Sequence, residues 1–120
     1  MSAHRLFVSS EVMAKVAGNL DVKFESWMQD WPLEVANPAR LSDFLHHYEI
    51  EKDIERRRLI AELIAYSLND AFSLARPSTE MLERAGKVMR THVDLLEYWA
   101  CRDAATADDT FALTAWIRTL

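Results

Sequence analysis

Cys101 is the only cysteine of the chain, and its thiol is the first candidate for chemistry. Catalysis by cysteine needs a thiolate with a base such as histidine within hydrogen-bonding distance. His92, the nearest histidine in sequence, lies on the same predicted helix about 13 Å away, at 1.5 Å of rise per residue. His46 or His47 can reach Cys101 only through the fold. The sequence therefore favours a small buried or half-buried thiol over a nucleophile.

The adjacent histidines His46 and His47 are the strongest candidates for metal binding. Neighbouring side chains on a helix point about 100° apart, so the two imidazoles cannot easily share an ion. Asp43 and Glu51 share a helix face with His47, but the sequence has no Glu-x-x-His or His-x-x-x-His pair on another helix to complete a site. We expect no metal site here, and we expect His92 to be a hydrogen-bonded core histidine.

Residues 56–58 are three consecutive arginines, a pattern found in nucleic-acid-binding segments. Four acidic side chains in residues 49–58 balance these arginines and Lys52. Four-residue spacings also let Asp53 pair with Arg57, and Arg58 with Glu62, along the helix surface. The segment is therefore predicted to be a solvated, self-neutralising helix face.

Known catalytic and phosphate-binding motifs are missing from the sequence. Gly18 and Gly86 are isolated, so neither a Walker loop nor a dinucleotide fingerprint can form. There is no Gly-x-Ser-x-Gly elbow, and Ser67 has no histidine near it in sequence. We predict no catalytic residue, no cofactor and no metal, and hence a protein that is not an enzyme.

The elements that position these side chains are predicted to be helices, because two glycines in 120 residues leave few positive-φ positions for hairpins. Apolar periodicity and capping residues predict helices near residues 11–17, 21–31, 38–48, 53–75, 79–99 and 115–120. Their predicted boundaries are Gly18-Asn19 as a C-cap pair, Asp21 as an N-cap, Pro32 as a stop, Asn37-Pro38 as a start, Ser78 or Thr79 as an N-cap, and Leu113-Thr114 as staple and N-cap.

The central segment, near residues 53–75, has the clearest pattern. Its apolar positions, with Ala61 and Ala65, cover more than half the circumference of a helix, so we expect neighbours on several sides. The predicted fold is all-α: one domain over residues 1–120, built as a compact bundle of five or six helices around this long central helix.

Composition limits the classes of partner and the cellular compartments that we expect for this protein. Half of the residues are hydrophobic and the net charge is −5, which argues against disorder and against a large nucleic-acid footprint, and suits a basic protein partner. One cysteine fits a reducing compartment. The apolar run near the N-terminus is too short for a signal peptide, and no segment approaches the roughly 20 apolar residues that span a bilayer. We expect a cytoplasmic monomer or homodimer with no membrane contact.

Tryptophans suggest where a protein partner could bind. Trp27 and Trp31 precede Pro32 and are accompanied by Asp30 and Glu34. Exposed aromatic residues ringed by carboxylates suit an interface, although a core position is the preferred interpretation for these tryptophans. We expect Trp99 to lie in the core.

The C-terminal two thirds, roughly residues 41–120, resemble the small helical immunity proteins of bacterial toxin systems. The resemblance rests on Leu45, Tyr48, the run Leu59-Ile60-Ala-Glu-Leu63-Ile64-Ala-Tyr-Ser67-Leu-Asn-Asp70, the pair Tyr98-Trp99 and the run Phe111-Ala-Leu-Thr-Ala-Trp-Ile-Arg118-Thr-Leu. It implies a protein that binds and blocks a toxin domain. The matching residues are mostly core and cap positions, so the resemblance assigns no site residue.

An inhibitor of a basic toxin would use acidic contacts, since complementary charge steers association. Asp103, Asp108 and Asp109 on a predicted loop, with Asp30 and Glu34, are the candidate contacts, and the alternative is that these carboxylates only keep the protein soluble. The alternative function is a small helical regulator, dimeric through the face that carries Trp27, that binds nucleic acid weakly through residues 52–58. An enzyme or metal protein using His46, His47 and Cys101 ranks third.

Overall fold

The computed structural model describes residues 10–25, 28, 30–106 and 109–120, and all regular structure in these ranges is helical. The predicted all-α class is confirmed. In chain order the elements are α1 (Ser10–Leu20), α2 (Trp31–Glu34), the 3-10 helix η1 (Pro38–Arg40), α3 (Leu41–Ile50), α4 (Ile54–Leu74), α5 (Thr79–Thr91), α6 (Val93–Ala100) and α7 (Thr114–Ile117).

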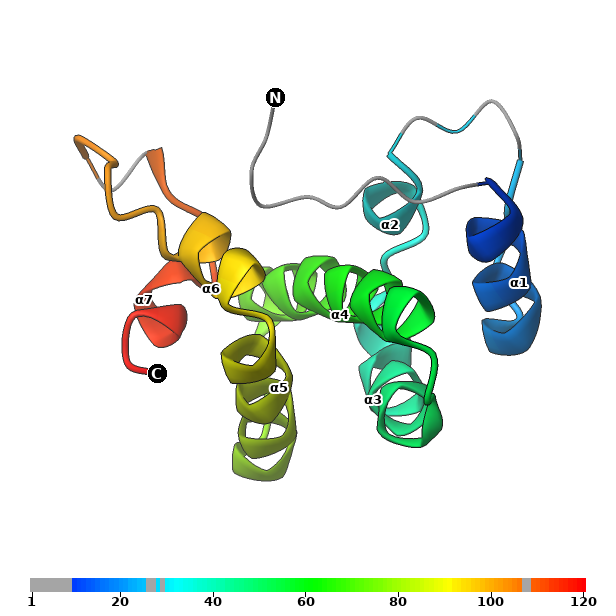
Figure 1. Ribbon diagram of the computed structural model, residues 1–120. Helices are drawn as coiled ribbons and strands as arrows, with labels where there is room; N and C mark the ends of the chain where they lie inside the picture. The colour runs from blue at the N-terminus through cyan, green and yellow to red at the C-terminus, as the bar shows by residue number, and fades with distance from the viewer. Residues whose placement is uncertain (1–9, 26–27, 29, 107–108) are drawn as a thin grey trace.

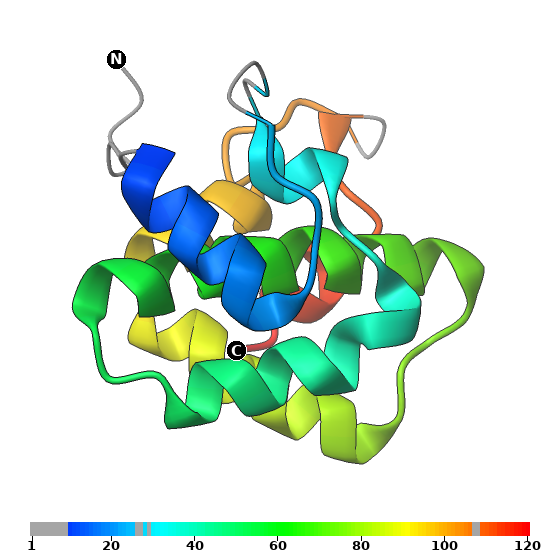
Figure 2. The ribbon, with the colours of Figure 1, turned by 90° about the vertical axis from the view of Figure 1, so that its right-hand side faces the viewer.

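Helix α4 is the long central helix that the sequence predicts. It runs through the middle of the molecule, with α1, α2 and α3 toward one side and α5, α6 and α7 toward the other (Figures 1 and 2). Residues 58–65, 67 and 68 of α4 are all buried, so neighbours cover the helix all round. The buried apolar side chains form one core cluster within a body of 38 × 34 × 24 Å. Within the described residues, no helix has the length and apolar character that crossing a membrane requires.

Several helix starts follow the predicted capping chemistry. Ser78 Oγ accepts a hydrogen bond from the Met81 amide at 3.3 Å and caps α5. Asn37 Oδ1 accepts from the Ala39 amide at 3.0 Å, and Pro38 opens η1, which leads directly into α3. Asp53, which is not among the predicted caps, accepts through Oδ1 from an amide of the first turn of α4. Each cap satisfies an amide that has no partner inside its own helix.

The predicted helix over residues 21–31 is wrong, because Asp21 ends α1 and does not begin a second helix. Asp21 lies at φ 55°, while no glycine of the described chain has positive φ. The Val22 amide donates to the Ala17 carbonyl at 3.0 Å and the Asp21 amide to the Gly18 carbonyl at 3.3 Å, which is a Schellman motif. Gly18 therefore lies inside α1 and is not its cap, and the described part of residues 22–30 has no helix.

Pro32 does not end a helix, as the sequence suggested, but lies in the first turn of α2. Proline suits that position because the first amides of a helix have no intrahelical partner. The short helix α2 packs against α4.

The single helix predicted over residues 79–99 is broken at His92. His92 has φ −110° and ψ 79°, outside the helical range, and joins α5 to α6. No glycine or proline marks the break. The contacts that accompany it are long-range: the His92 ring hydrogen-bonds Tyr48 of α3, and Asp94 of α6 pairs with Arg58 of α4. This break gives seven α-helices in the described chain where the sequence indicated five or six.

Candidate functional site

The predicted acidic contacts of α2 lie at the surface. Glu34 is exposed and Asp30 is partly exposed. The Asp30 amide donates to Glu34 Oε2 at 3.2 Å, which turns the Glu34 carboxylate toward the start of the helix. A carboxylate at this position is stabilised by the unpaired amides of the first helical turn.

Trp31 is a core residue, so its assignment to a partner-binding surface is corrected. Its side chain is 0% exposed, and its indole Nε1 donates to the Lys23 carbonyl at 2.6 Å. The bond links α2 to the segment that follows α1, and it satisfies the one polar atom that a buried tryptophan brings with it. Trp27, the other predicted tryptophan, lies outside the described residues.

The predicted acidic loop follows α6. Asp103 and Asp109 are exposed, and Thr106 Oγ1 donates to Asp109 Oδ2 at 3.3 Å; Asp108 lies outside the described residues. The start of the loop is held by Arg118, whose guanidinium donates to the carbonyls of Ala100 and Cys101, each at 2.8 Å.

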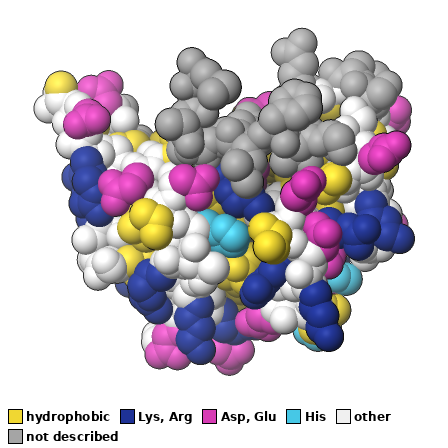
Figure 3. All heavy atoms as spheres, viewed as in Figure 1, with side chains coloured by type: hydrophobic (Ala, Val, Ile, Leu, Met, Phe, Trp, Pro, Cys, Tyr) yellow, Lys and Arg dark blue, Asp and Glu magenta, His cyan; other side chains and the backbone are white. Residues whose placement is uncertain are grey.

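The loop after α6 and helix α2 both lie on the upper side of the molecule in Figures 1 and 2, and Figure 1 shows the loop at the left of that side and α2 to the right of its centre. The segments that carry Asp30 and Glu34 and that carry Asp103 and Asp109 therefore share one side of the molecule, although about seventy residues of chain separate the two pairs. We call these four residues the acidic end. On the face seen in Figure 3, acidic, basic and hydrophobic side chains are interspersed and do not gather by kind.

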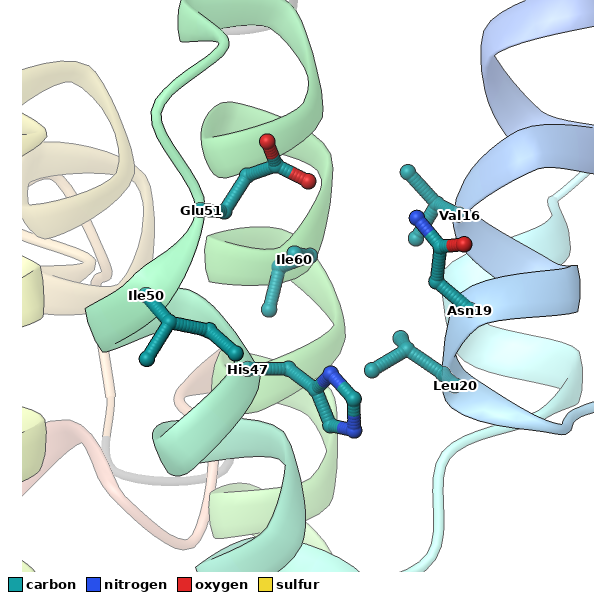
Figure 4. A pocket seen from close by; sticks show the side chains of 7 residues that line it. All are labelled: Val16, Asn19, Leu20, His47, Ile50, Glu51 and Ile60. Carbon is teal, nitrogen blue, oxygen red and sulfur yellow. The ribbon is translucent and has the colours of Figure 1, made fainter.

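A pocket of about 320 Å³ lies between α1 and the corner where α3 leads to α4 (Figure 4). Its apolar lining comes from α1, α3 and α4, and its polar groups are the side chains of Asn19, His47 and Glu51. His47 Nε2 is 3.6 Å from Asp43 Oδ1, and Glu51 accepts from the backbone amides of residues 52 and 53. Two of the groups considered for metal binding from the sequence therefore have protein partners.

No group of three metal-ligating side chains forms among the residues that the structure describes. The Cys101 thiol is half-buried, and its polar contacts there are the Tyr98 carbonyl at 3.7 Å and the Thr114 hydroxyl at 3.8 Å. Neither contact supplies a base that could take the proton of the thiol. Cys101 has φ 49° and ends α6 in the left-handed conformation.

A buried ionic cluster that the sequence did not predict as buried lies between α4 and α6. Arg58 and Glu62 are only 3% and 5% exposed, and their charged groups are 3.0 Å apart. Arg58 also donates to Asp94 Oδ2 at 2.6 Å. The four-residue spacing correctly pairs Arg58 with Glu62, but the solvated face predicted for them is wrong.

The same cluster continues to an aromatic pair. The Tyr48 hydroxyl and His92 Nε2 are 2.8 Å apart, and the Arg57 guanidinium lies 4.4 Å from the centre of the Tyr48 ring. Burial and the nearby Arg58 charge lower the pKa of His92 below its usual value, against the opposing effect of Asp94. Burial raises the pKa of Tyr48. His92 is hydrogen-bonded as expected, but it is half-buried and does not belong to the core.

These contacts reduce the number of accessible cations in the basic segment, residues 52–58. Of the three consecutive arginines, Arg57 stacks on Tyr48 and Arg58 is buried in ion pairs, while Arg56 is partly exposed and Lys52 is exposed. Phosphate contacts need accessible cations along one surface. The fold thus turns two of the four cations of residues 52–58 toward the protein.

No protein-family model, no curated protein and no solved structure matches this chain.

Proposed function

We propose that this chain is a cytoplasmic binding protein that inhibits one basic protein partner by stoichiometric occlusion, as an immunity protein does to its toxin. One observation supports the proposal: Glu34 of α2, Asp103 and Asp109 are exposed and Asp30, just before α2, is partly exposed, and the two segments that carry them lie on the same side of the molecule (Figures 1 and 2). The sequence resemblance and the net charge of −5 agree with it.

Occlusion needs no reacting group on the inhibitor. Carboxylates that converge on one end attract a basic surface and raise the rate of productive encounter. The buried contacts of a toxin complex would then set its lifetime, because affinity differences between related complexes arise mostly in the dissociation rate.

The test is an affinity purification of the tagged protein from its native cell extract at moderate salt, with mass spectrometry of the eluate. We expect one basic protein at a one-to-one ratio. Recovery of nucleic acid in its place would favour the helical regulator, and elution of the bait alone from cells that make the partner would contradict the proposal.

Charge variants then test the acidic end with the purified partner. Asp30→Asn with Glu34→Gln, and Asp103→Asn with Asp109→Asn, should each slow association at low ionic strength by about tenfold. The matched control is Glu80→Gln with Glu83→Gln, which removes the same charge from exposed positions of α5. Equal slowing by the control would show that net charge acts and that the acidic end does not.

A further inference from the structure

A groove lies between α5 and the C-terminal segment that contains α7. It has a volume of about 430 Å³, within the range of small-molecule sites. Its lining comes from the α4–α5 connection, from one face of α5 and from the chain at and after α7: Arg76, Thr79, Leu82, Glu83, Lys87, Arg90, Trp116, Thr119 and Leu120.

The inner wall of the groove is apolar. Leu82 and Trp116 are each 8% exposed, and Leu120 is half-buried. The Trp116 ring packs against Phe72 of α4, with ring centroids 5.9 Å apart, so its position is fixed from behind. The hydrophobic contribution to binding at this wall would come mainly from the apolar body of the ligand, which leaves water when it lies against these side chains.

Gly86 lies next to this wall on α5. A Cβ at position 86 would lie 3.4 Å from Arg90 Nη1 and 3.5 Å from Leu120 Cδ2. The guanidinium of Arg90 therefore bends back over Gly86 toward Leu120, which brings a cation to the apolar wall.

The rim of the groove is cationic, in contrast to the chain as a whole. Arg76, Lys87 and Arg90 line it with a single carboxylate, that of Glu83. In the described part of the chain, none of the ion pairs includes these three cations. The pairing of Glu83 with Lys87 that four-residue spacing favours is not formed.

Another cation of α5, Arg84, does have an ion-pair partner, on a different face of the helix. On the face toward α3, Arg84 holds Glu49 by two hydrogen bonds of 2.9 and 3.0 Å, and this contact lowers the pKa of Glu49. Among the described residues the three groove cations form no ion pair of this kind, although the charge of Lys87 also acts on Glu49. Guanidinium groups bind carboxylates and phosphates through parallel hydrogen bonds. An external anion in the groove would therefore give these cations an acidic partner.

We propose that this groove binds a small organic anion with an apolar body, an aliphatic or aromatic carboxylate whose hydrocarbon part lies on Leu82 and Trp116 and whose charged group meets Lys87 and Arg90. An inorganic anion would leave the apolar wall unused, and a neutral hydrocarbon would leave the cations unpaired. The site is separate from the acidic end and does not depend on the inhibitor function.

Isothermal titration with octanoate tests the site on the full chain, with 1-octanol, octyltrimethylammonium and inorganic phosphate as comparison ligands. We expect octanoate to bind at one site and more tightly than each of the other three. In nitrogen–proton correlation spectra, octanoate should shift the Trp116 indole signal. Similar binding of octanol or phosphate would overturn the proposed class of ligand, and absence of octanoate binding would overturn the site.

The double variant Lys87→Gln with Arg90→Gln should weaken octanoate binding by about tenfold or more, because hydrogen bonds to charged groups are among the stronger ones. Both side chains are exposed, so the fold should be kept, and the circular dichroism spectrum checks this. The control, Lys15→Gln with Lys52→Gln, removes two exposed lysines away from the groove and should leave the affinity unchanged. Equal weakening by both pairs would show non-specific attraction and overturn the proposal.

Discussion

The imidazole of His92 lies where α3, α4 and the α5–α6 junction meet. It bonds Tyr48 of α3, faces the charges of Arg57 and Arg58 of α4, and is followed by Asp94, which pairs with Arg58. Burial and the two arginines disfavour the protonated ring, and these effects outweigh that of Asp94, because the pKa of His92 is lowered. His92 is therefore a neutral hydrogen-bonding partner near pH 7.

This shift predicts a pH dependence of stability. In the unfolded chain the histidine takes up a proton near its ordinary pKa of about 6.5, while the folded protein takes it up only at lower pH. The free energy of unfolding should therefore fall as the pH drops below about 6.5, until the folded pKa is passed. Denaturant unfolding at several pH values between 5 and 7.5 measures this slope.

His92→Gln should reduce the slope, because glutamine can bond the Tyr48 hydroxyl but does not titrate. His46→Gln, at an exposed position of α3, is the matched control. An unchanged slope in His92→Gln would mean that other groups cause the pH dependence in this range. Glu49 should act only at lower pH, because the stability that its lowered pKa provides is lost as the carboxylate becomes protonated.

Residue spacing predicts pairs better than it predicts their surroundings. The pairing of Arg58 with Glu62 follows from local helix geometry, and the structure has it. Its burial does not follow, because burial depends on contacts between residues that are distant in sequence, such as the bond from Arg58 to Asp94, 36 residues further along the chain. The expected pairing of Asp53 with Arg57 gives way to two other contacts, since Asp53 caps α4 and Arg57 stacks on Tyr48.

The ends of the helices show the same limit at the scale of the element. Asn37, Ser78 and Pro38 take the positions that their side chains predict, because capping involves only neighbouring residues. The end of α1 could not be predicted in this way. A glycine is the expected left-handed residue, yet Asp21 adopts that conformation and the helix continues through Gly18. The break at His92 has long-range partners and no local signal.

Gly18→Ala tests the end of α1. No atom lies within 4 Å of a Cβ placed at Gly18, and its φ is not positive, so alanine should raise the free energy of unfolding by about 0.5–1 kcal/mol. Thermal or denaturant unfolding measures the change.

Asp21→Gly is the companion variant, and it should also stabilise the protein because it relieves a left-handed non-glycine residue. A loss of stability in Gly18→Ala would place the end of the helix at Gly18, where the sequence suggested it.

At the scale of the whole molecule, the net charge of the sequence does not show how the fold distributes charged side chains over the surface. The net charge of −5 suggests an acidic partner-binding surface, and this stays a prediction. The net charge also does not reveal the three cations at the groove beside α5, because only the tertiary fold brings Arg76, Lys87 and Arg90 close to Trp116. Periodicity predicts the all-α class and the long α4, whereas the groove requires knowledge of which helices meet.

The burial of α4 should slow the hydrogen exchange of its backbone amides with water. Amides of residues 58–68 can exchange hydrogen with solvent only when the surrounding helices separate, so their exchange should report global unfolding. The four-residue helices α2 and α7 can open locally and should exchange faster. Mass-spectrometric exchange that reaches α4 as early as α7 would show that the central helix is not the last part of the molecule to open.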